Sequence, residues 1–150
     1  MPDVVTIEFA ELADLPYIKP LLTELMEATE DTEGFNTETA VENYIGLLES
    51  PDNFILVAKQ CNRVLGLINF SVRRTMLHPA PSGLIDELVV TADTRGRGIG
   101  KRLVLGAIDK CRDLGCCEVE VSTEKSNITA KEFYASCGFE GDAVLFEKHI

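Results

Sequence analysis

The sequence has few of the features that mark membrane, secreted or metal-binding proteins. Its longest apolar stretches, such as residues 54–58, fall well short of the roughly 20 residues that cross a bilayer. The first eight residues contain no basic segment followed by an apolar one, so we expect no secretory signal. The only histidines, His78 and His149, do not lie near paired cysteines of metal-binding spacing. We therefore expect no membrane span, no metal site and a cytoplasmic location.

Basic residues are scarce in one half of the chain. The net charge is −11, and residues 1–60 contain 13 acidic but only 2 basic residues, against 12 of each in residues 61–150. This acidic field argues against nucleic acid as a partner, because phosphate binding needs a basic surface. It favours solubility and, more weakly, a cationic ligand.

The composition is that of an ordinary globular protein. The chain has 150 residues, of which 45% are hydrophobic and 26% are charged. This length suits one core without metals or disulfides, so we expect a single domain over residues 1–150. The five cysteines form an odd set, which favours reduced thiols packed as small hydrophobic side chains.

Hydrophobic periodicity predicts alternating strands and helices. In the first half, Asp14 and Thr37 are predicted to cap two helices, the second of which ends before Pro51. The other segments expected in this half are strands at 4–9, 53–60, 64–74 and 84–91, with a loop at 77–83.

The second half has the pattern of a strand-helix-strand crossover. A helix is expected from Ile99 to a stop at Gly115, then a strand at 116–122, a helix at 127–137 and one or two strands within 139–150. The expected fold is α+β: a mixed, mostly antiparallel sheet with helices on both faces. Strands 84–91 and 116–122 should form its parallel pair.

A glycine-rich turn joins a predicted strand to the start of a predicted helix. Unpaired backbone N–H groups and the positive end of the helix dipole meet at such a place, so the turn is a candidate anion site. A Walker loop is excluded because Arg102 stands where a hydroxyl is required, and a Rossmann fingerprint because Lys101 stands where glycine is required. The residues of the turn are Arg95, Gly96, Arg97, Gly98, Ile99 and Gly100.

The turn and the segment before it resemble the GNAT superfamily of N-acetyltransferases. The family's signature, Arg/Gln-x-x-Gly-x-Gly/Ala after a strand ending in valine, matches Arg95, Gly98 and Gly100 after Val90. A second motif is an asparagine seven residues before a tyrosine that precedes a Gly-Phe pair. It matches Asn127, Tyr134 and the pair at 138–139.

The resemblance implies an acetyl-CoA-dependent enzyme that acetylates an amine by direct attack in a ternary complex. Backbone groups of Leu88, Val89 and Val90 would pair with the pantetheine arm of acetyl-CoA as an added strand would. The glycine-rich turn would hold the pyrophosphate, and Asn127 would bond to the pantetheine. The alternatives are a CoA-binding sensor module and an acyltransferase that uses a different acyl-CoA.

The chemistry also needs a proton acceptor and a proton donor. The resemblance makes Tyr134 the candidate donor to the CoA sulfur. Asp86 and Glu87 are the candidate bases, and Glu120 is a third. In a regular strand Asp86 and Glu87 point to opposite faces, so only one would face the acceptor unless a bulge intervenes. A water chain to bulk solvent is an alternative to a dedicated base.

The acceptor is expected to be a small-molecule or peptide amine. In relatives the two N-terminal helices and their connecting loop form one wall of the acceptor channel, and here that loop is the acidic segment 30–34. The charge of this segment favours polycationic amines. A homodimer is a further possibility.

Overall fold

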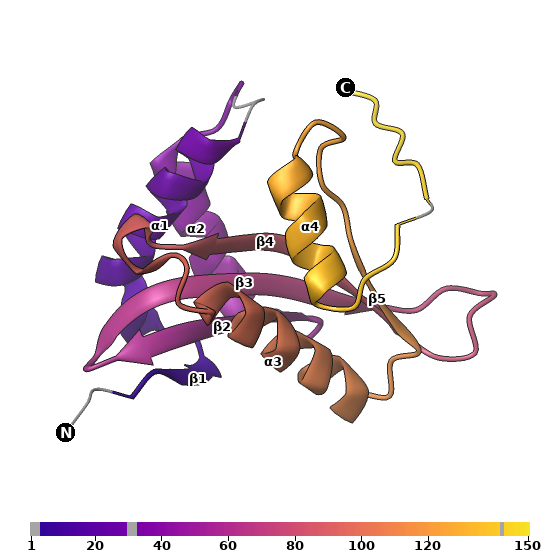
Figure 1. Ribbon diagram of the computed structural model, residues 1–150, viewed down its shortest axis with the longest axis horizontal. Coiled ribbons are helices and arrows are strands. Elements are labelled where there is room, and N and C mark those ends of the chain that lie inside the picture. The colour runs from indigo at the N-terminus through magenta and orange to yellow at the C-terminus, as the bar shows by residue number, and fades with distance from the viewer. Residues whose placement is uncertain (1–3, 30–32, 142) are drawn as a thin grey trace.

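The computed structural model describes residues 4–29, 33–141 and 143–150 of the chain (Figure 1). The elements in chain order are β1 (Thr6–Phe9), the short 3-10 helix η1 (Leu12–Asp14), α1 (Leu15–Ala28), α2 (Thr37–Leu48), β2 (Asn53–Gln60), β3 (Arg63–Arg73), β4 (Ser82–Val90), the 3-10 helix η2 (Ala92–Thr94), α3 (Ile99–Asp113), β5 (Glu118–Val121) and α4 (Ile128–Ser136).

The five strands form one mixed sheet in the order β1-β2-β3-β4-β5. Strands β1 to β4 are antiparallel to their neighbours, whereas β4 and β5 run parallel. The chain between β4 and β5 contains α3, as a parallel crossover requires. The mixed sheet and its parallel pair confirm the fold class predicted from the sequence.

Helices cover both faces of the sheet. On one face, Ile18 of α1 and Tyr44 of α2 pack against Val57, Leu67 and other apolar side chains of β2, β3 and β4. On the other face, α3 packs on the central strands (Figure 1). The partly buried rings of Phe133 and Tyr134 in α4 pack against the apolar cluster between α3 and the sheet. Strands β2 and β3 are buried on both faces because they lie between these two layers.

Two polar contacts fix the N-terminal helices to the sheet. Asp14, only 5% exposed, forms an ion pair with Lys59 of β2, with Oδ1 and Nζ 2.9 Å apart. The hydroxyl of Tyr44 in α2 donates a hydrogen bond to the carbonyl of Glu11 at 2.7 Å. Removing one partner of a buried charge pair is strongly destabilising, so these contacts hold α1 and α2 in place over the sheet.

Two predicted element boundaries are corrected by the structure. The N-cap of α2 is Asn36, whose Oδ1 accepts a hydrogen bond from the backbone N–H of Thr39 at 2.8 Å, and Thr37 is the first helical residue. Strand β4 begins at Ser82, inside the segment predicted as a loop, because residues 82–85 pair with both β3 and β5.

The strands predicted within residues 139–150 are wrong. Among the described residues that follow α4, none belongs to a strand. Figure 1 shows this C-terminal segment, in yellow, running away from the sheet. Its apolar side chains Val144, Leu145 and Phe146 are exposed, because no neighbouring strand covers them. No helix of the described residues is both long and apolar enough to cross a membrane.

Candidate active site

Strands β4 and β5 pair only along their first four positions. Their pairing runs from Ser82 with Glu118 to Ile85 with Val121. On its other side β4 stays paired with β3 as far as Val90. Beyond Ile85, the side of β4 that faces β5 is therefore an open strand edge, and it includes the predicted cofactor-binding residues Leu88, Val89 and Val90. Such an edge can accept an extended ligand as an added strand.

One group on this open edge is already engaged. The side chain of Arg95 donates a hydrogen bond from Nε to the carbonyl of Val90 at 3.0 Å. This contact ties the first residue of the glycine-rich turn to the last residue of β4. The open edge and the turn therefore form one continuous surface.

The turn presents backbone amides to an open space. Gly96 and Gly98 adopt positive φ angles of 79° and 77°, and no heavy atom lies within 4 Å of where a Cβ would stand on either residue. The first helical hydrogen bond of α3 runs from the N–H of Arg102 to the carbonyl of Gly98. The N–H groups of residues 99–101 therefore have no acceptor inside the helix. With the dipole of α3 and the guanidinium of Arg97, this arrangement suits a phosphate group.

Helix α4 lies beside the turn. A Cβ added to Gly100 would lie 3.5 Å from the ring of Phe133, and Lys101 donates from Nζ to the carbonyl of Ser136 at 3.1 Å. Asn127 is the N-cap of α4, and its Oδ1 accepts a hydrogen bond from the N–H of Ala130 at 3.0 Å. Because Oδ1 is used in the cap, the Nδ2 group of Asn127 is the part of the side chain that could donate a hydrogen bond to a ligand.

Tyr134 is half-buried between two aromatic rings. Its ring makes edge contacts with Phe133 and Phe139, at centroid distances of 5.1 and 5.7 Å. Burial, with a smaller contribution from Cys137, raises the pKa of Tyr134 to about 12. The phenol therefore keeps its proton at neutral pH, as a proton donor must.

A β-bulge brings both predicted acidic residues to one side of the sheet. Asn69 of β3 pairs with Glu87, and the next residue, Phe70, pairs with Ile85, so Asp86 is an extra residue in β4. As a result Asp86 and Glu87 line the same pocket. The alternation of a regular strand does not hold here, so the exception allowed for a bulge applies and both carboxyls lie on the pocket side of β4.

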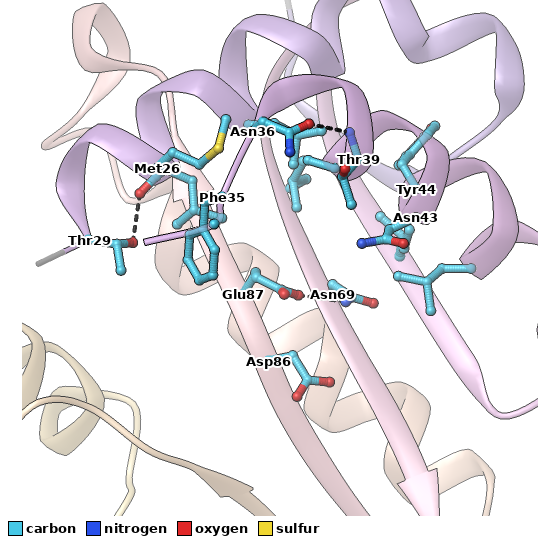
Figure 2. A pocket seen from close by; sticks show the side chains of 17 residues that line it. Met26, Thr29, Phe35, Asn36, Thr39, Asn43, Tyr44, Asn69, Asp86 and Glu87 are labelled. Carbon is cyan, nitrogen blue, oxygen red and sulfur yellow. Dashed lines mark hydrogen bonds between the residues drawn. The ribbon is translucent and has the colours of Figure 1, made fainter. Parts of the chain in front are cut away.

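This pocket, of about 420 Å³, lies between α1, α2 and the sheet (Figure 2). Its walls are mostly apolar, and its polar side chains come from the end of α1, from α2 and the residue before it, and from the middle of β3 and β4. The residues that line it are Leu22, Leu25, Met26, Thr29, Gly34, Phe35, Asn36, Thr39, Ala40, Asn43, Tyr44, Leu47, Ile55, Leu67, Asn69, Asp86 and Glu87.

A chain of amides holds the carboxylate of Glu87. Asn69, which is 7% exposed, donates from Nδ2 to Glu87 at 2.6 Å and accepts at Oδ1 from Asn53 at 2.6 Å. Figure 2 shows the side chains of Asn69 and Glu87 pointing toward one another across the pocket floor. The sequence analysis missed Asn69. Its signal was a single amide inside the apolar run of a central strand, since buried polar groups need partners.

The two carboxyls have raised pKa values. Burial is the main cause of the raised pKa of Glu87, the charge of Asp86 adds to it, and the hydrogen bond from Asn69 opposes it. Burial likewise raises the pKa of Asp86 against a hydrogen bond from Ser71. Carboxyls with raised pKa values in a pocket are candidates for proton transfer.

Glu120, the third candidate base, does not reach this pocket. Its carboxylate forms an ion pair with Arg73, with Oε2 and Nη2 3.2 Å apart.

The acidic segment predicted to form a wall of the acceptor channel is residues 30–34. Most of it, residues 30–32, lies outside the described part of the chain. Within that part, no group of three or more His, Cys, Asp or Glu side chains is placed to hold a metal ion.

Comparison with known proteins identifies the family. Residues 16–139 match the acetyltransferase (GNAT) family. An aminoalkylphosphonate N-acetyltransferase of Salmonella typhimurium is 26% identical over 147 residues, which cover 98% of this chain and 92% of the relative. An uncharacterized N-acetyltransferase of Bacillus subtilis is 30% identical over 118 residues, 76% of this chain and 83% of the relative.

A solved structure shares the fold over the whole chain. It is an aminoglycoside N-acetyltransferase in complex with CoA, and it superposes with a TM-score of 0.86 at 18% identity. The match covers 99% of this chain and 97% of the other. The arrangement of sheet and helices described above is therefore that of a known acetyltransferase structure.

Proposed function

Because the chain belongs to the acetyltransferase (GNAT) family, we propose that it transfers an acetyl group from acetyl-CoA to a primary amine by direct attack in a ternary complex. The observation that carries this proposal is the open edge of β4 beyond Ile85. It adjoins the amide-rich turn at one end and the two carboxyls of the pocket at the other. Both substrates can therefore reach the same stretch of β4.

The chain's own groups suit the binding of acetyl-CoA. The amides of residues 99–101 and the guanidinium of Arg97 bind the pyrophosphate, and the open edge at Leu88 and Val89 pairs with the pantetheine arm. The free Nδ2 of Asn127 donates to the same arm. These roles follow from the positive φ glycines, the unpaired helix amides and the end of the β4–β5 pairing.

Four groups serve the chemistry. Glu87 accepts the proton that the amine must lose before it attacks the thioester, and the neighbouring Asp86 attracts the ammonium form into the pocket. A main-chain N–H near Leu88 or Val89 stabilises the oxyanion. Tyr134 donates a proton to the departing CoA thiolate. No cysteine takes part as a covalent intermediate.

The acceptor is a small amine, in keeping with a pocket of about 420 Å³. The relative from Salmonella typhimurium is named for an aminoalkylphosphonate, and the structural neighbour for an aminoglycoside. Both named acceptors are amines. For this chain the carboxylates of Asp86 and Glu87 favour an acceptor that enters as a cation.

We also propose that two copies of the chain associate. The exposed apolar side chains of Val144, Leu145 and Phe146 would gain from being covered by a second copy. Light scattering during gel filtration tests this, and a monomer at micromolar concentration would contradict it.

A reducing compartment such as the cytoplasm suits the unpaired thiols of Cys116 and Cys117.

The proposed activity is tested with a panel of primary amines and acetyl-CoA, following release of the CoA thiol. We expect steady release that depends on the amine, with N-acetylated product found by mass spectrometry. Tight binding of CoA without turnover on any amine would contradict the proposal and indicate a CoA-binding module. Faster release from propionyl- or succinyl-CoA would instead contradict the acetyl preference.

A further inference from the structure

The pocket beside β4 contains acidic and neutral polar groups but no positive charge. None of the described residues that line it is lysine, arginine or histidine. A phosphate, phosphonate or carboxylate group on the acceptor would therefore find no cation to pair with in this pocket.

Basic residues of the surrounding elements lie outside the lining of this pocket. Lys59 forms its ion pair with the buried Asp14 at 2.9 Å. Lys19, the other base of the first 60 residues, is exposed and lies one turn before Leu22, the first residue of α1 to line the pocket. At the far end of β3, Arg73 pairs with Glu120 at 3.2 Å. Among the described residues that line the pocket, Asp86 and Glu87 are therefore the only charged side chains that an acceptor meets.

The rest of the lining is apolar or uncharged. Leu22, Leu25 and Leu47 form apolar walls, and Phe35, which is 58% exposed, adds an aromatic face. Asn36, Thr39 and Asn43 are uncharged lining residues whose side chains can form hydrogen bonds with a ligand. If the acceptor carries an apolar group beside its amine, this group would cover these walls. The burial of apolar surface would then contribute to binding in proportion to the area covered.

On the basis of the acetyltransferase function above, we propose that this pocket selects amines with an apolar body and no anionic group, such as aralkylamines and alkyldiamines. An anionic substituent would be desolvated without a partner. It would also be repelled by the two carboxylates on β4. An ammonium group meets the opposite situation, since the same carboxylates attract it.

Matched pairs of amines that differ only in a remote anionic group test this proposal. Suitable pairs are tyramine with O-phosphotyramine and phenethylamine with 4-(2-aminoethyl)benzoic acid. Two quantities are measured: kcat/KM with acetyl-CoA, and the Kd of each amine by calorimetry on protein loaded with CoA. We expect the anionic member to lose about 100-fold or more in both quantities, because like charges in an interface are strongly unfavourable.

A positive charge placed in the pocket should weaken this preference for amines without an anionic group. Asn43→Arg puts a guanidinium among the lining residues, and we expect it to raise kcat/KM for O-phosphotyramine relative to tyramine by about tenfold or more. The control is Glu42→Gln, which makes the same change in net charge at the adjacent, exposed position outside the lining. It should leave the ratio within about twofold.

The outcomes separate this proposal from the function on which it rests. Equal binding of both members of each pair would overturn the selectivity, even if the enzyme is active. Binding of neither member of any pair would overturn it as well, because the pocket would then not be an amine site. Selective binding without turnover would support the selectivity and contradict the acetyltransferase function.

Discussion

At the scale of single residues, the role of general base proposed for Glu87 depends on how its carboxylate is held. Asn53 fixes the orientation of the Asn69 amide, and Asn69 in turn fixes one oxygen of Glu87 by a hydrogen bond of 2.6 Å. Burial and the nearby charge of Asp86 raise the pKa of Glu87 against that hydrogen bond. A carboxylate whose pKa lies nearer to the working pH is a more effective general base. The site therefore combines fixed geometry with increased basicity.

Replacing this carboxylate should remove the base and its pH dependence. We expect Glu87→Gln to lower kcat/KM by about 10²- to 10⁴-fold, the usual contribution of a general base. In the wild type, kcat/KM should fall as the pH drops through the raised pKa of Glu87, at a pH above the ordinary glutamate value of about 4.3. The variant should lose this limb of the profile. A variant with an unchanged profile would favour a water chain as the base.

The same raised pKa values carry a prediction for stability. A carboxyl whose pKa is higher in the folded state than in the unfolded state stabilises the fold only while it is protonated, and this contribution is lost as the pH rises through the folded-state pKa. The ionised forms of Glu87 and Asp86 therefore oppose folding at neutral pH, by a small amount because both side chains remain in contact with solvent. We expect Glu87→Gln and Asp86→Asn to raise Tm at pH 7.5, with a smaller gain near pH 4. A lower Tm at neutral pH would contradict the raised pKa values.

Tyr134 should matter for turnover and not for cofactor affinity. We expect Tyr134→Phe to lower kcat by about 10²- to 10⁴-fold while the Kd of acetyl-CoA stays nearly the same, because only the phenolic proton is lost. The control is Tyr17→Phe, which removes the same hydroxyl from an exposed tyrosine of α1. Wild-type turnover in the Tyr134 variant would make Tyr134 a packing residue between Phe133 and Phe139.

The residues at this site show what a sequence can and cannot predict. The candidate residues Asp86, Glu87 and Tyr134 were found because motifs and acidic side chains are visible in the sequence. The bulge at Asp86 was not predictable, because it depends on how β3 and β4 pair. Asn69 became a candidate only once its register opposite Glu87 was known.

At the scale of elements, the N-terminus of α3 carries the predicted phosphate site. We expect Gly98→Glu to weaken CoA binding by about 100-fold or more. A side chain is strained at the positive φ of 77°, and a carboxylate would repel the pyrophosphate. Calorimetry with CoA measures the effect.

A matched glycine at the other end of α3 provides the control. Gly115 has a φ of 79° and, like Gly98, no heavy atom within 4 Å of where a Cβ would stand. Gly115→Glu therefore imposes the same backbone strain and the same charge far from the turn. It should lower Tm but leave the Kd of CoA within about twofold. Equal weakening by both variants would remove the turn from the cofactor site.

The elements that the sequence predicted correctly are those whose partners lie inside the chain. Helix α3 has a strong hydrophobic period and strands β2 and β3 have continuous apolar runs, and each is packed or paired as its pattern requires. The segment 139–150 has strand-forming residues, but strand formation depends on a neighbour to complete the backbone hydrogen bonds. Composition alone does not reveal whether such a neighbour exists.

At the scale of the whole molecule, the excess negative charge and the turn that suits a polyphosphate lie in different parts of the chain. Residues 1–60, which contain α1 and α2, hold the whole net charge of −11, and these two helices line the pocket proposed for the acceptor. The turn that suits a polyphosphate lies in the half without net charge. An anionic substrate and a cationic one would therefore approach different parts of the surface, which limits competition between them.

This division should be measurable as a salt-dependent preference for cationic acceptors. Reversing three exposed acids of α1 and α2 outside the pocket, Glu27→Lys, Glu38→Lys and Glu42→Lys, removes the attractive field without touching the lining. We expect kcat/KM for a diamine to fall about 3- to 10-fold at low ionic strength. The difference from wild type should disappear at 0.5 M salt, where the screening length is well below the 10 Å found at 0.1 M.

The control applies the same change of charge to the other half of the molecule. Asp113→Lys, Glu140→Lys and Glu147→Lys alter exposed acids that are also outside the pocket. If the acidic half attracts the acceptor, this second triple variant should change kcat/KM for the diamine much less than the first. Neither variant should raise the KM for acetyl-CoA, because neither adds negative charge near the turn. Equal losses in both triple variants would mean that total charge, and not its location over α1 and α2, governs the approach of the acceptor.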